Sequence, residues 1–338
     1  KSMKKFLIGI DVSKQKLDVC LIDQSGVIKE EIIIGNQPSV IYAYFKKASK
    51  EYGFGQSELL VCAEYTGRYI YPLCCACHES GVDLWLENPT QIKYRSGLKR
   101  GKNDKLDARK IAMYAKRFQD EAKLFSMPEK TIATLKQLIK ERGMYMVDKG
   151  KYRGQLTDQK MFMDKDDYKR KSKRLMVFIK QLDEAISQTE EDIRVLIDSD
   201  PDLSNQFKLL RSVEGVGEQT AVKMIVETNA FKDFKDPRKF CCHAGVAPFS
   251  YTSGSSIRSR NKVSNRADKS IKALLHMGAL IAATRMKGEL HDYYVRKVDE
   301  GKNKMSVLNA IRAKLVYRMF AVIRNDRMYE KNYQNSLA

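Results

Sequence analysis

Four carboxylates are spaced as a divalent-cation site would need them. Asp11 ends the apolar run FLIGID, Glu64 ends the run LLVCAE, and Asp104 and Asp107 lie three residues apart in KNDKLDARK. Residues three apart on a helix share a face, with Cβ atoms about 5–6 Å apart, so the last two can act on one ligand. A carboxylate in an apolar strand is costly unless a partner or a metal compensates it. Oxygen donors without a histidine near them in sequence suit Mg²⁺ or Mn²⁺ rather than zinc.

Cations held by these acids would suit phosphodiester chemistry. Two ions about 3.5–4 Å apart can activate an attacking oxygen and stabilise a leaving oxygen. The structural alternative is that Asp104 caps its helix and that Asp107 pairs with Arg109 or Lys110. Either half of that alternative accounts for one acid, but the four acids in this chain order favour a metal site.

The second pair of acids lies inside a basic segment. KRGKNDKLDARK (99–110) holds six Lys or Arg residues, and we expect Lys99, Arg100, Lys102 and Lys105 to contact a phosphate backbone. The whole chain of 338 residues carries 62 Lys and Arg against 42 Asp and Glu, a formal charge of +20. That excess favours a polyanionic partner, and nucleic acid is the leading candidate.

No membrane segment, export signal or zinc site is expected. There is no run of about 18 apolar residues, and the N-terminal apolar run is interrupted early by Asp11 and Lys14. Seven scattered cysteines, an odd number, are typical of free thiols in a reducing compartment. The cluster around Cys74–His78 falls in an expected amphipathic helix, where thiols pack like apolar groups, and the short cluster Cys241–His243 is not expected to bind zinc either.

A serine-rich, basic loop is the second candidate for chemistry. In the segment 240–275 four serines stand in a Gly-containing stretch, and basic residues follow them: Ser250, Ser253, Ser255 and Ser256, then Arg258, Arg260 and Lys262. One interpretation is a phosphate-binding loop, since hydroxyl and guanidinium groups both contact phosphates. The other is that a serine attacks a phosphodiester and becomes linked to DNA, with the arginines stabilising the charged transition state. Composition alone does not choose between them.

A Gly-x-Gly turn precedes this loop. LLRSVEGVGEQTAVKMIVE (209–227) predicts helix, turn and helix, with Gly215 and Gly217 in the turn. Glycines in such a helix-hairpin-helix pattern let backbone N–H groups at a helix start approach a phosphate closely. An ordinary tight helical turn is the alternative.

The N-terminal pattern predicts a mixed α/β sheet. Apolar runs predict strands at 5–12, 16–23, 30–36, 58–67 and 82–88, and helices are expected at 37–53, 68–81 and 104–118. The order βββ-α-β-α-β-α gives an antiparallel edge followed by parallel crossovers. That is the order of the ribonuclease-H-like (RuvC-like) fold.

The remainder is predicted to be helical. Leu175, Ile179, Leu182, Ile186, Thr189, Ile193 and Leu196 repeat with spacings of 4 and 3, which indicates a helix paired as in a coiled coil. Residues 132–146 could be its antiparallel partner or a separate strut. The charge run 165–174 is either a solvated hairpin or a phosphate-contacting tip, and 198–206 looks like a linker. We therefore expect three domains, at 1–125, 126–204 and 205–338, the last mostly α.

Taken together, these motifs resemble a known family. IGIDVSKQKLDV, CAEYTG, NPTQIKYRSGLKRGKNDKLDARKIA, SVEGVGEQTA and FCCHAGVAPFSYTSG are similar to segments of the insertion-sequence 110 (IS110) family transposases. These are also called DEDD transposases and are described as bridge-RNA-guided serine recombinases. The ordered set is specific as a whole, whereas each piece alone is weak.

The resemblance implies roles for particular residues. It assigns the four family acids to Asp11, Glu64, Asp104 and Asp107, as ligands of Mg²⁺ or Mn²⁺, and the nucleophile to Ser253 before Gly254, although the neighbouring serines leave that position open. It further implies a RuvC-like domain, a coiled coil and a C-terminal transposase domain. The enzyme would cut and rejoin donor and target DNA through a 5′-phosphoserine link, with both sites chosen by a structured noncoding bridge RNA.

The resemblance also implies a homo-oligomer, from dimer to tetramer, acting in the cytoplasm of a bacterium or archaeon in association with the nucleoid. Two alternatives stay open. One is a metal-dependent RuvC-like nuclease or junction resolvase that uses activated water. The other is a non-catalytic nucleic-acid scaffold whose acids cap helices.

Overall fold

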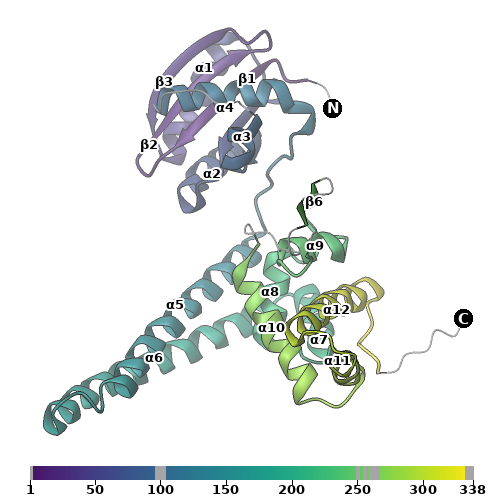
Figure 1. Cartoon of the computed structure of the whole chain (residues 1–338). Helices are drawn as coiled ribbons and strands as arrows, with labels where there is room; N and C mark the ends of the chain where they lie inside the picture. Colours follow the sequence, from purple (N-terminus) through teal and green to yellow (C-terminus); the bar gives the residue numbers. More distant parts are fainter. Residues whose placement is uncertain (1–2, 96–103, 249–251, 254–256, 259–266, 332–338) are drawn as a thin grey trace, which may run out of the picture. The chain divides into compact units, whose positions relative to one another are not determined.

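The computed structural model describes residues 3–95, 104–248, 252–253, 257–258 and 267–331. The chain divides into two compact units, Lys1–Met127 and Pro128–Ala338, which are described separately here (Figure 1). The boundary lies close to the first one expected from sequence. The predicted further division at 204/205 stays a prediction.

A five-stranded mixed sheet forms the centre of the first unit. Its strands, in spatial order, are β3 (Ile28–Gly35), β2 (Lys16–Asp23), β1 (Phe6–Val12), β4 (Leu59–Glu64) and β5 (Asp83–Glu87). β1 pairs antiparallel with β2, and β2 with β3, whereas β4 is parallel to both β1 and β5. This topology confirms the predicted ribonuclease-H-like fold: three antiparallel strands of a meander, then parallel strands reached by helical crossovers.

Helices cover both faces of this sheet (Figure 1). α1 (Pro38–Tyr52) and α2 (Tyr71–Ser80) pack over one core, which contains Ile8, Ile10 and Val61. α4 (Asp104–Phe118) packs over the other, which contains Leu7 and Cys62. The alternation of strand side chains between the two cores follows from the two-residue period of a strand. The short elements are α3 (Pro89–Arg95), which the sequence analysis missed, and the 3₁₀ turns η1 (Gln56–Glu58), η2 (Gly67–Ile70) and η3 (Gln119–Glu121).

Gly9 allows α4 to lie directly on the sheet. A Cβ atom at Gly9 would be 2.2 Å from the backbone nitrogen of Ala112 and 2.3 Å from the carbonyl oxygen of Ala108. Backbone atoms cannot move aside as a flexible side chain can, so no other residue fits without displacing the helix. Both helix residues at the contact are alanines and are buried. The chain thus brings α4 to backbone contact with β1, two residues before Asp11.

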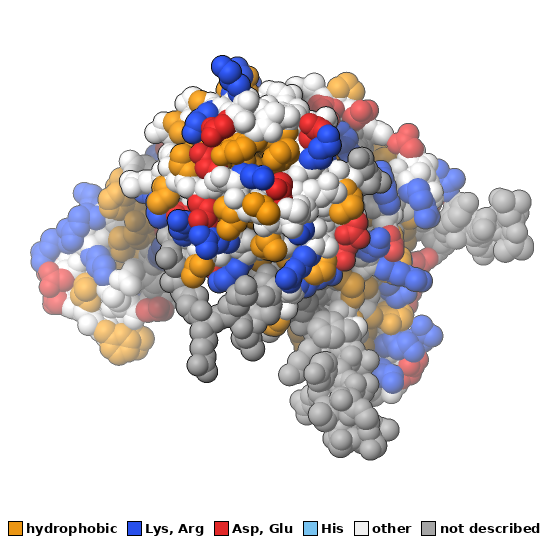
Figure 2. All heavy atoms as spheres, turned by 90° about the horizontal axis from the view of Figure 1, so that it is seen from above, with side chains coloured by type: hydrophobic (Ala, Val, Ile, Leu, Met, Phe, Trp, Pro, Cys, Tyr) orange, Lys and Arg blue, Asp and Glu red, His pale blue; other side chains and the backbone are white. Residues whose placement is uncertain are grey.

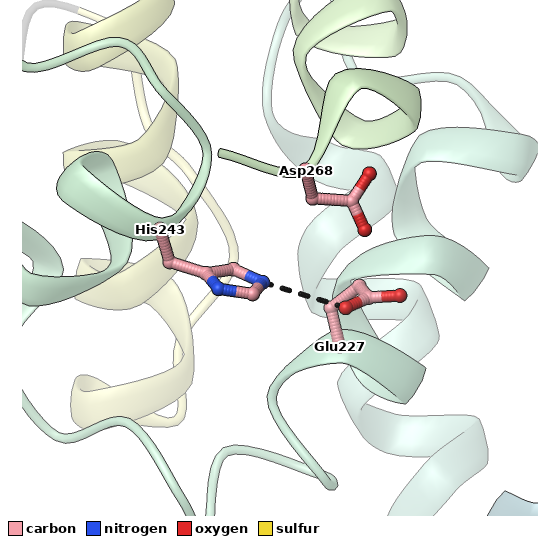
Figure 3. A group of neighbouring side chains, drawn as sticks. All are labelled: Glu227, His243 and Asp268. Carbon is pink, nitrogen blue, oxygen red and sulfur yellow. Dashed lines mark ion pairs between the residues drawn. The ribbon is translucent and has the colours of Figure 1, made fainter. Parts of the chain in front are cut away.

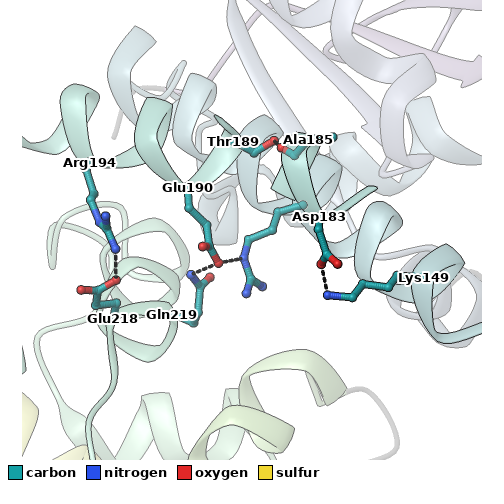
Figure 4. Close-up of polar contacts among 9 residues, drawn as sticks. Lys149, Asp183, Ala185, Thr189, Glu190, Arg194, Glu218 and Gln219 are labelled. Carbon is teal, nitrogen blue, oxygen red and sulfur yellow. Dashed lines mark hydrogen bonds and ion pairs between the residues drawn. The ribbon is translucent and has the colours of Figure 1, made fainter. Parts of the chain in front are cut away.

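The second unit begins with a long helical hairpin, α5 (Lys130–Asp158) and α6 (Lys165–Asp198). All seven residues of the predicted heptad on α6 are buried or half-buried, so the coiled-coil pairing is confirmed, and α5 is the partner. Charged pairs also join the two helices: Arg142 Nε lies 2.6 Å from Glu190 Oε1, and Lys149 pairs with Asp183 (Figure 4). The charge run 165–174 falls in the first turns of α6.

The rest of the second unit is helical and shares one core with the base of the hairpin. Its elements are α7 (Pro201–Ser212), α8 (Glu218–Glu227), α9 (Pro237–His243), β6 (Thr252–Ser253), β7 (Ile257–Arg258), α10 (Lys269–Thr284), α11 (Glu289–Asp299) and α12 (Lys304–Asn325). Ile132, Leu135, Ile193 and Ile197 of the hairpin belong to this core. The linker expected at 198–206 is wrong, because Asp200 caps α7 and that helix starts at once. Among the described helices none is long and apolar enough to cross a membrane.

Replacing Gly9 with alanine tests the contact between α4 and the sheet. We expect Gly9→Ala to lower the free energy of unfolding by about 1–3 kcal/mol, the usual cost of overpacking a core. The matched control is Gly143→Ala in α5, where nothing lies within 4 Å of the added Cβ; it should gain about 0.5–1 kcal/mol from helix propensity. Urea denaturation measures both, and equal effects of the same sign would contradict the contact.

Candidate active site

Asp11 and Glu64 lie side by side at one edge of the sheet. β1 and β4 are parallel, and their register pairs Ile10 with Ala63, so the next residue on each strand is an acid. Leu7 and Cys62 face the core under α4, and residues an even number apart on a strand share a face. Asp11 and Glu64 therefore project to the α4 side, where both are half-buried.

Asp107 approaches these two acids from α4. Burial raises the pKa of Glu64, and the negative charges of Asp11 and Asp107 raise it further. Like charges disfavour ionisation when they are near. The geometry agrees, because Ala108, next to Asp107, touches Gly9, which lies two residues before Asp11. This contact holds the helix against the strand that carries Asp11.

Lys110 provides the positive charge beside this group. Its Nζ lies 2.7 Å from Asp107 Oδ1, and its charge acts against the rise in the pKa of Glu64. Arg109 and Lys110 were the two partners expected for Asp107 from sequence, and the structure selects Lys110. Arg109 instead forms a two-pronged ion pair with Glu31 on β3.

Lys105 is also engaged by Glu31, at 3.2 Å. Its side chain is still 58% exposed, so the pair does not bury it. Arg109 and then Lys105 hold the pKa of Glu31 at about 2. The predicted role of Lys105 in contacting nucleic acid thus competes with an ion pair to the sheet, and it stays a prediction.

Asp104 is the first residue of α4, and its side chain lies outside the described part of the chain. Lys99, Arg100 and Lys102 also lie outside the described residues. The membership of Asp104 in the site and the phosphate contacts of the three basic residues therefore remain predictions.

Two further acids lie at the same sheet edge and were not selected from sequence. Asp18 on β2 stands directly opposite Asp11, is only 5% exposed, and pairs with Lys16 at 3.0 Å. Glu87 on β5 stands beside Glu64, and its Oε2 accepts a hydrogen bond from the Tyr114 hydroxyl at 3.0 Å. Both occupy strand positions that share the face of the first two acids. The strand register, which the sequence pattern does not contain, is the signal that finds them.

The donor set fits a hard divalent cation. Asp11, Glu64 and Asp107 offer carboxylate oxygens only, the ligands that Mg²⁺ and Mn²⁺ prefer. Burial, and then the charges of Asp11 and Asp107, raise the pKa of Glu64, while Lys110 opposes this rise. The ligand atoms of these three acids are not all within 4.8 Å of one another; among the residues described, Glu227, His243 and Asp268 of the second unit form the one such group. A cation would have to draw the three acids together.

The second unit carries the predicted serine and the Gly-x-Gly turn. Ser253 is in β6, which pairs antiparallel with β7 so that Ser253 stands opposite Ile257 and Thr252 opposite Arg258. The side chains of this pair of strands are outside the description, as are Ser250, Ser255, Ser256, Arg260 and Lys262 altogether. The role of Ser253 as the nucleophile therefore stays a prediction.

The Gly-x-Gly turn joins α7 and α8 as predicted, but its two glycines have different surroundings. Gly215 has φ +84° and touches the backbone of Gly278 on α10, where an added Cβ would lie 2.8 Å from the Gly278 oxygen. Gly217 precedes α8 with an exposed backbone and open space around it. Packing therefore accounts for Gly215, whereas Gly217 keeps the geometry for a phosphate contact.

Two family models match the chain. One is described as "Transposase IS116/IS110/IS902 family" and matches residues 207–295, and the other, for DEDD transposases of the IS110 type, matches residues 8–158. Together they cover more than two thirds of the sequence.

Curated relatives match over the whole length or part of it. Pilin gene-inverting proteins of Moraxella lacunata and Moraxella bovis are each 25% identical over 346 residues, covering 97% of this chain and 99% of theirs. An uncharacterised 44.8 kDa protein of insertion element IS116 from Streptomyces clavuligerus is 25% identical over 148 residues, covering 44% of this chain and 36% of its own.

Solved structures of RuvC are similar to part of the chain. Thermus thermophilus RuvC in complex with a Holliday junction substrate matches with 15% identity and a TM-score of 0.28, covering 37% of this chain and all of that one. A second RuvC structure from the same organism gives 16% identity and a TM-score of 0.27. The fold assignment itself rests on the strand order and register described above.

Replacing Glu64 with glutamine tests the crowding of negative charge. Because the folded state raises the pKa of Glu64 above its usual 4.5, its ionised form destabilises the fold at neutral pH. We expect Glu64→Gln to raise the free energy of unfolding at pH 7 in the presence of EDTA. The gain should vanish below about pH 4.5, where Glu64 is protonated in both the folded and the unfolded chain. Chemical denaturation at both pH values measures this.

Glu87→Gln is the matched control, because its amide oxygen can still accept the Tyr114 hydrogen bond. No comparable gain is expected from it. Added Mg²⁺ should stabilise the wild type and the Glu87 variant more than the Glu64 variant. Equal Mg²⁺ stabilisation of all three proteins would remove Glu64 from the cation site.

Proposed function

We propose that this chain joins donor and target DNA through a covalent phosphoserine intermediate, under the guidance of a structured noncoding RNA. The chain belongs to the IS110 family of transposases and is an enzyme that cleaves and rejoins DNA. The family assignment comes from the two matching family models and the full-length relatives. The finer mechanism is the proposal. The gathering of Asp11, Glu64 and Asp107 at one sheet edge is the observation that carries it.

In the proposed site the acids hold divalent cations, Mg²⁺ or Mn²⁺. Asp11, Glu64 and Asp107 would be ligands, with Asp104 as the fourth, and Lys110 would release Asp107 when a cation binds. When bound, the ions would activate the attacking oxygen and stabilise the leaving oxygen. Asp18 and Glu87 flank the ligands. Asp18 pairs with Lys16, and Glu87 accepts a hydrogen bond from Tyr114, so these contacts would hold the strand ends in place and keep both acids from competing for the cation.

The covalent step is assigned to Ser253. Its hydroxyl oxygen forms a bond to phosphorus and gives up its proton, the bond from phosphorus to the 3′ oxygen breaks, and that oxygen leaves as a 3′-hydroxyl. The 5′-phosphate stays on the serine. A 3′-hydroxyl of the partner strand then attacks phosphorus and releases the serine, so no high-energy cofactor is consumed. Arg258 opposite Thr252, with Arg260 and Lys262, would stabilise the charge that develops on the phosphate.

The nucleic-acid partners follow from charge and from the relatives. The formal charge of +20 supports binding to polyanions. On the face drawn in Figure 2, Lys and Arg side chains are mixed with acidic ones, so their excess is dispersed there rather than gathered into one patch. Relatives named for inverting a pilin gene, which match over 99% of their length, support rearrangement of double-stranded DNA. The bridge RNA, the homo-oligomer of two to four chains and the nucleoid as the place of action belong to the proposal.

Substituting the serine tests the covalent step. A nicked substrate in which the leaving strand diffuses away should trap the wild-type protein on the 5′ end of DNA, visible as a slower band on a denaturing gel. We expect Ser253→Ala to form no adduct and to lose strand transfer at least 10³-fold, while it keeps its affinity for DNA. The control Ser250→Ala should form the adduct.

The same substrate separates the alternatives. Cleavage without any adduct, in the wild type and in Ser253→Ala alike, would favour a RuvC-like nuclease that uses activated water. Strand transfer that survives Asp107→Asn together with Asp11→Asn would remove the acids from the chemistry, whereas DNA binding by the wild type with neither cleavage nor adduct would favour the non-catalytic scaffold. An adduct that persists in Ser253→Ala but not in Ser250→Ala would assign the nucleophile to Ser250 instead of Ser253.

Copurification tests the guide RNA. We expect the protein expressed with its flanking element DNA to retain one structured RNA species after washing in high salt, identified by sequencing. Digestion of that RNA should abolish strand transfer, and its resynthesis should restore it. Strand transfer by the RNA-free protein at the rate of the RNA-bound protein would contradict the guided mechanism but not the covalent mechanism.

A further inference from the structure

Glu227, His243 and Asp268 converge at the two ends of the segment that carries Ser253. Glu227 is the last residue of α8, His243 ends α9, and Asp268 caps the start of α10 (Figure 3). One ligand atom of each lies within 4.8 Å of the others. His243 follows two cysteines in the sequence, but in the fold it lies beside acids from other helices.

Lys223 pairs with both carboxylates of this group, and His243 lies beside Glu227. His243 Nε2 lies 3.4 Å from Glu227 Oε2, and Lys223 Nζ lies 2.7 Å from Glu227 Oε1 and 3.9 Å from Asp268 Oδ2. The facing His243 and then Lys223 hold the pKa of Glu227 at about 2. Glu227 and Lys223 side chains are each only 14% exposed, so solvent screens their pairing less than at the surface.

The cluster has its own cation in Lys223. The ammonium group contacts both carboxylates, and the second oxygen of Asp268 accepts hydrogen bonds from the backbone N–H groups of Ser270 and Ile271. A metal ion would have to displace the lysine and disturb the cap of α10. The arrangement is therefore a polar clamp that joins α8 to the end of α9 through His243 and to the start of α10 through Lys223.

The clamp sits where the two ends of the segment 244–267 meet. The Asp268 N–H donates to the His243 carbonyl oxygen at 3.0 Å. Gly245 has φ +63°, and a Cβ there would lie 2.5 Å from the Cβ of Ala267. His243 and Asp268 are therefore adjacent in space, and β6 and β7 lie between them in the sequence.

A second contact fixes the first end of the segment. Asn309 Nδ2 donates to the Val246 carbonyl oxygen at 2.8 Å, and Asn309 in turn accepts from Arg312 at 3.2 Å. Arg312 is 6% exposed, donates to His276 Nδ1 at 2.7 Å, and has no acidic partner within ion-pair distance among the described residues. A buried guanidinium without a carboxylate is costly. One of the hydrogen bonds of Arg312 orients Asn309, which holds this end of the segment.

We propose that Glu227 and His243 are positioning residues that hold the two described ends of the segment that carries Ser253, residues 244–248 and 267–268, and so orient Ser253 for attack on DNA. This inference rests on the proposed role of Ser253. Neither residue touches the reacting atoms in the proposal. They act because an attacking oxygen displaced by about 1 Å can lose about 10²-fold in rate, and the clamp is what joins both ends of the segment to α8.

The test uses variants that keep the packing and remove the contact between the imidazole and the carboxylate. His243→Phe keeps a ring against Phe234 and Phe240, whose centroids lie 5.3 and 5.6 Å from the imidazole, and Glu227→Gln keeps the side-chain size. Glu300→Gln is the control, because it removes an ion pair with Lys297 on α11, away from the segment. Wild type, both single variants, the double variant and the control are compared in the full-length protein.

The first readout is the rate of adduct formation on the nicked substrate at saturating DNA. We expect each single variant to be about 10-fold slower with an unchanged Kd for DNA, and the double variant to be no slower than the singles, since both act through one contact. The control should match the wild type. Multiplicative losses in the double variant, or a loss in Kd alone, would overturn the clamp.

The second readout does not depend on chemistry. Amide hydrogen exchange should be faster in residues 244–268 of both variants and unchanged elsewhere, because the closing hydrogen bond at Asp268 opens more often. Unchanged exchange would overturn the proposal even if the adduct forms. If the variants exchange faster but even the wild type forms no adduct, the clamp is supported and the covalent mechanism is rejected. Stabilisation by added Zn²⁺ or Mn²⁺ that His243→Phe abolishes would show a metal site in its place.

Discussion

The backbone contact between Gly9 and α4 is the constraint on which the first unit depends. It removes the space that a side chain would fill, and so it sets the height of the helix above the sheet. At that height Asp107 comes close enough to raise the pKa of Glu64. The same contact brings Arg109 and Lys105 to Glu31 on the edge strand β3. One face of α4 thus faces the acids and the neighbouring face is tied to the sheet by basic residues, which explains why the segment carries both kinds of charge.

Sequence pattern predicted the elements well and their neighbours poorly. The strands, the bounds of α4 and the heptad on α6 follow from periodicity, which is local. The acids Asp18 and Glu87 follow from strand register, and the turn of His243 towards Glu227 follows from the packing of α8, α9 and α10; neither is encoded in a short window. The expected linker at 198–206 failed because Asp200 and Pro201 look like loop residues but serve as the cap and first residue of α7. Of the predicted site, Asp11 and Glu64 could be placed together because the carboxyl ends of the parallel strands β1 and β4 share an edge, whereas the approach of Asp107 depends on the contact of α4 with Gly9.

Both candidate sites hold charges that lower the stability of the fold. Negative charge crowds the sheet edge beyond what Lys110 compensates, and Arg312 is buried without an acid among the described residues. Such arrangements cost stability, and they persist where a ligand or a required geometry outweighs that cost. At the sheet edge the compensating partner would be a cation, whereas in the second unit it is a network of hydrogen bonds that ends on the backbone of Val246.

The hairpin of α5 and α6 has a consequence for how the chain can change in length. Apolar residues repeat every seven positions along its seam, and Arg142 and Lys149, themselves seven apart, pair with Glu190 and Asp183 on the other helix. An insertion of one or two residues in either helix would rotate its apolar stripe away from the partner and separate these charges. A whole heptad added to both helices would keep every pairing. Lineages with longer or shorter hairpins should therefore differ in steps of seven residues, matched on the two arms.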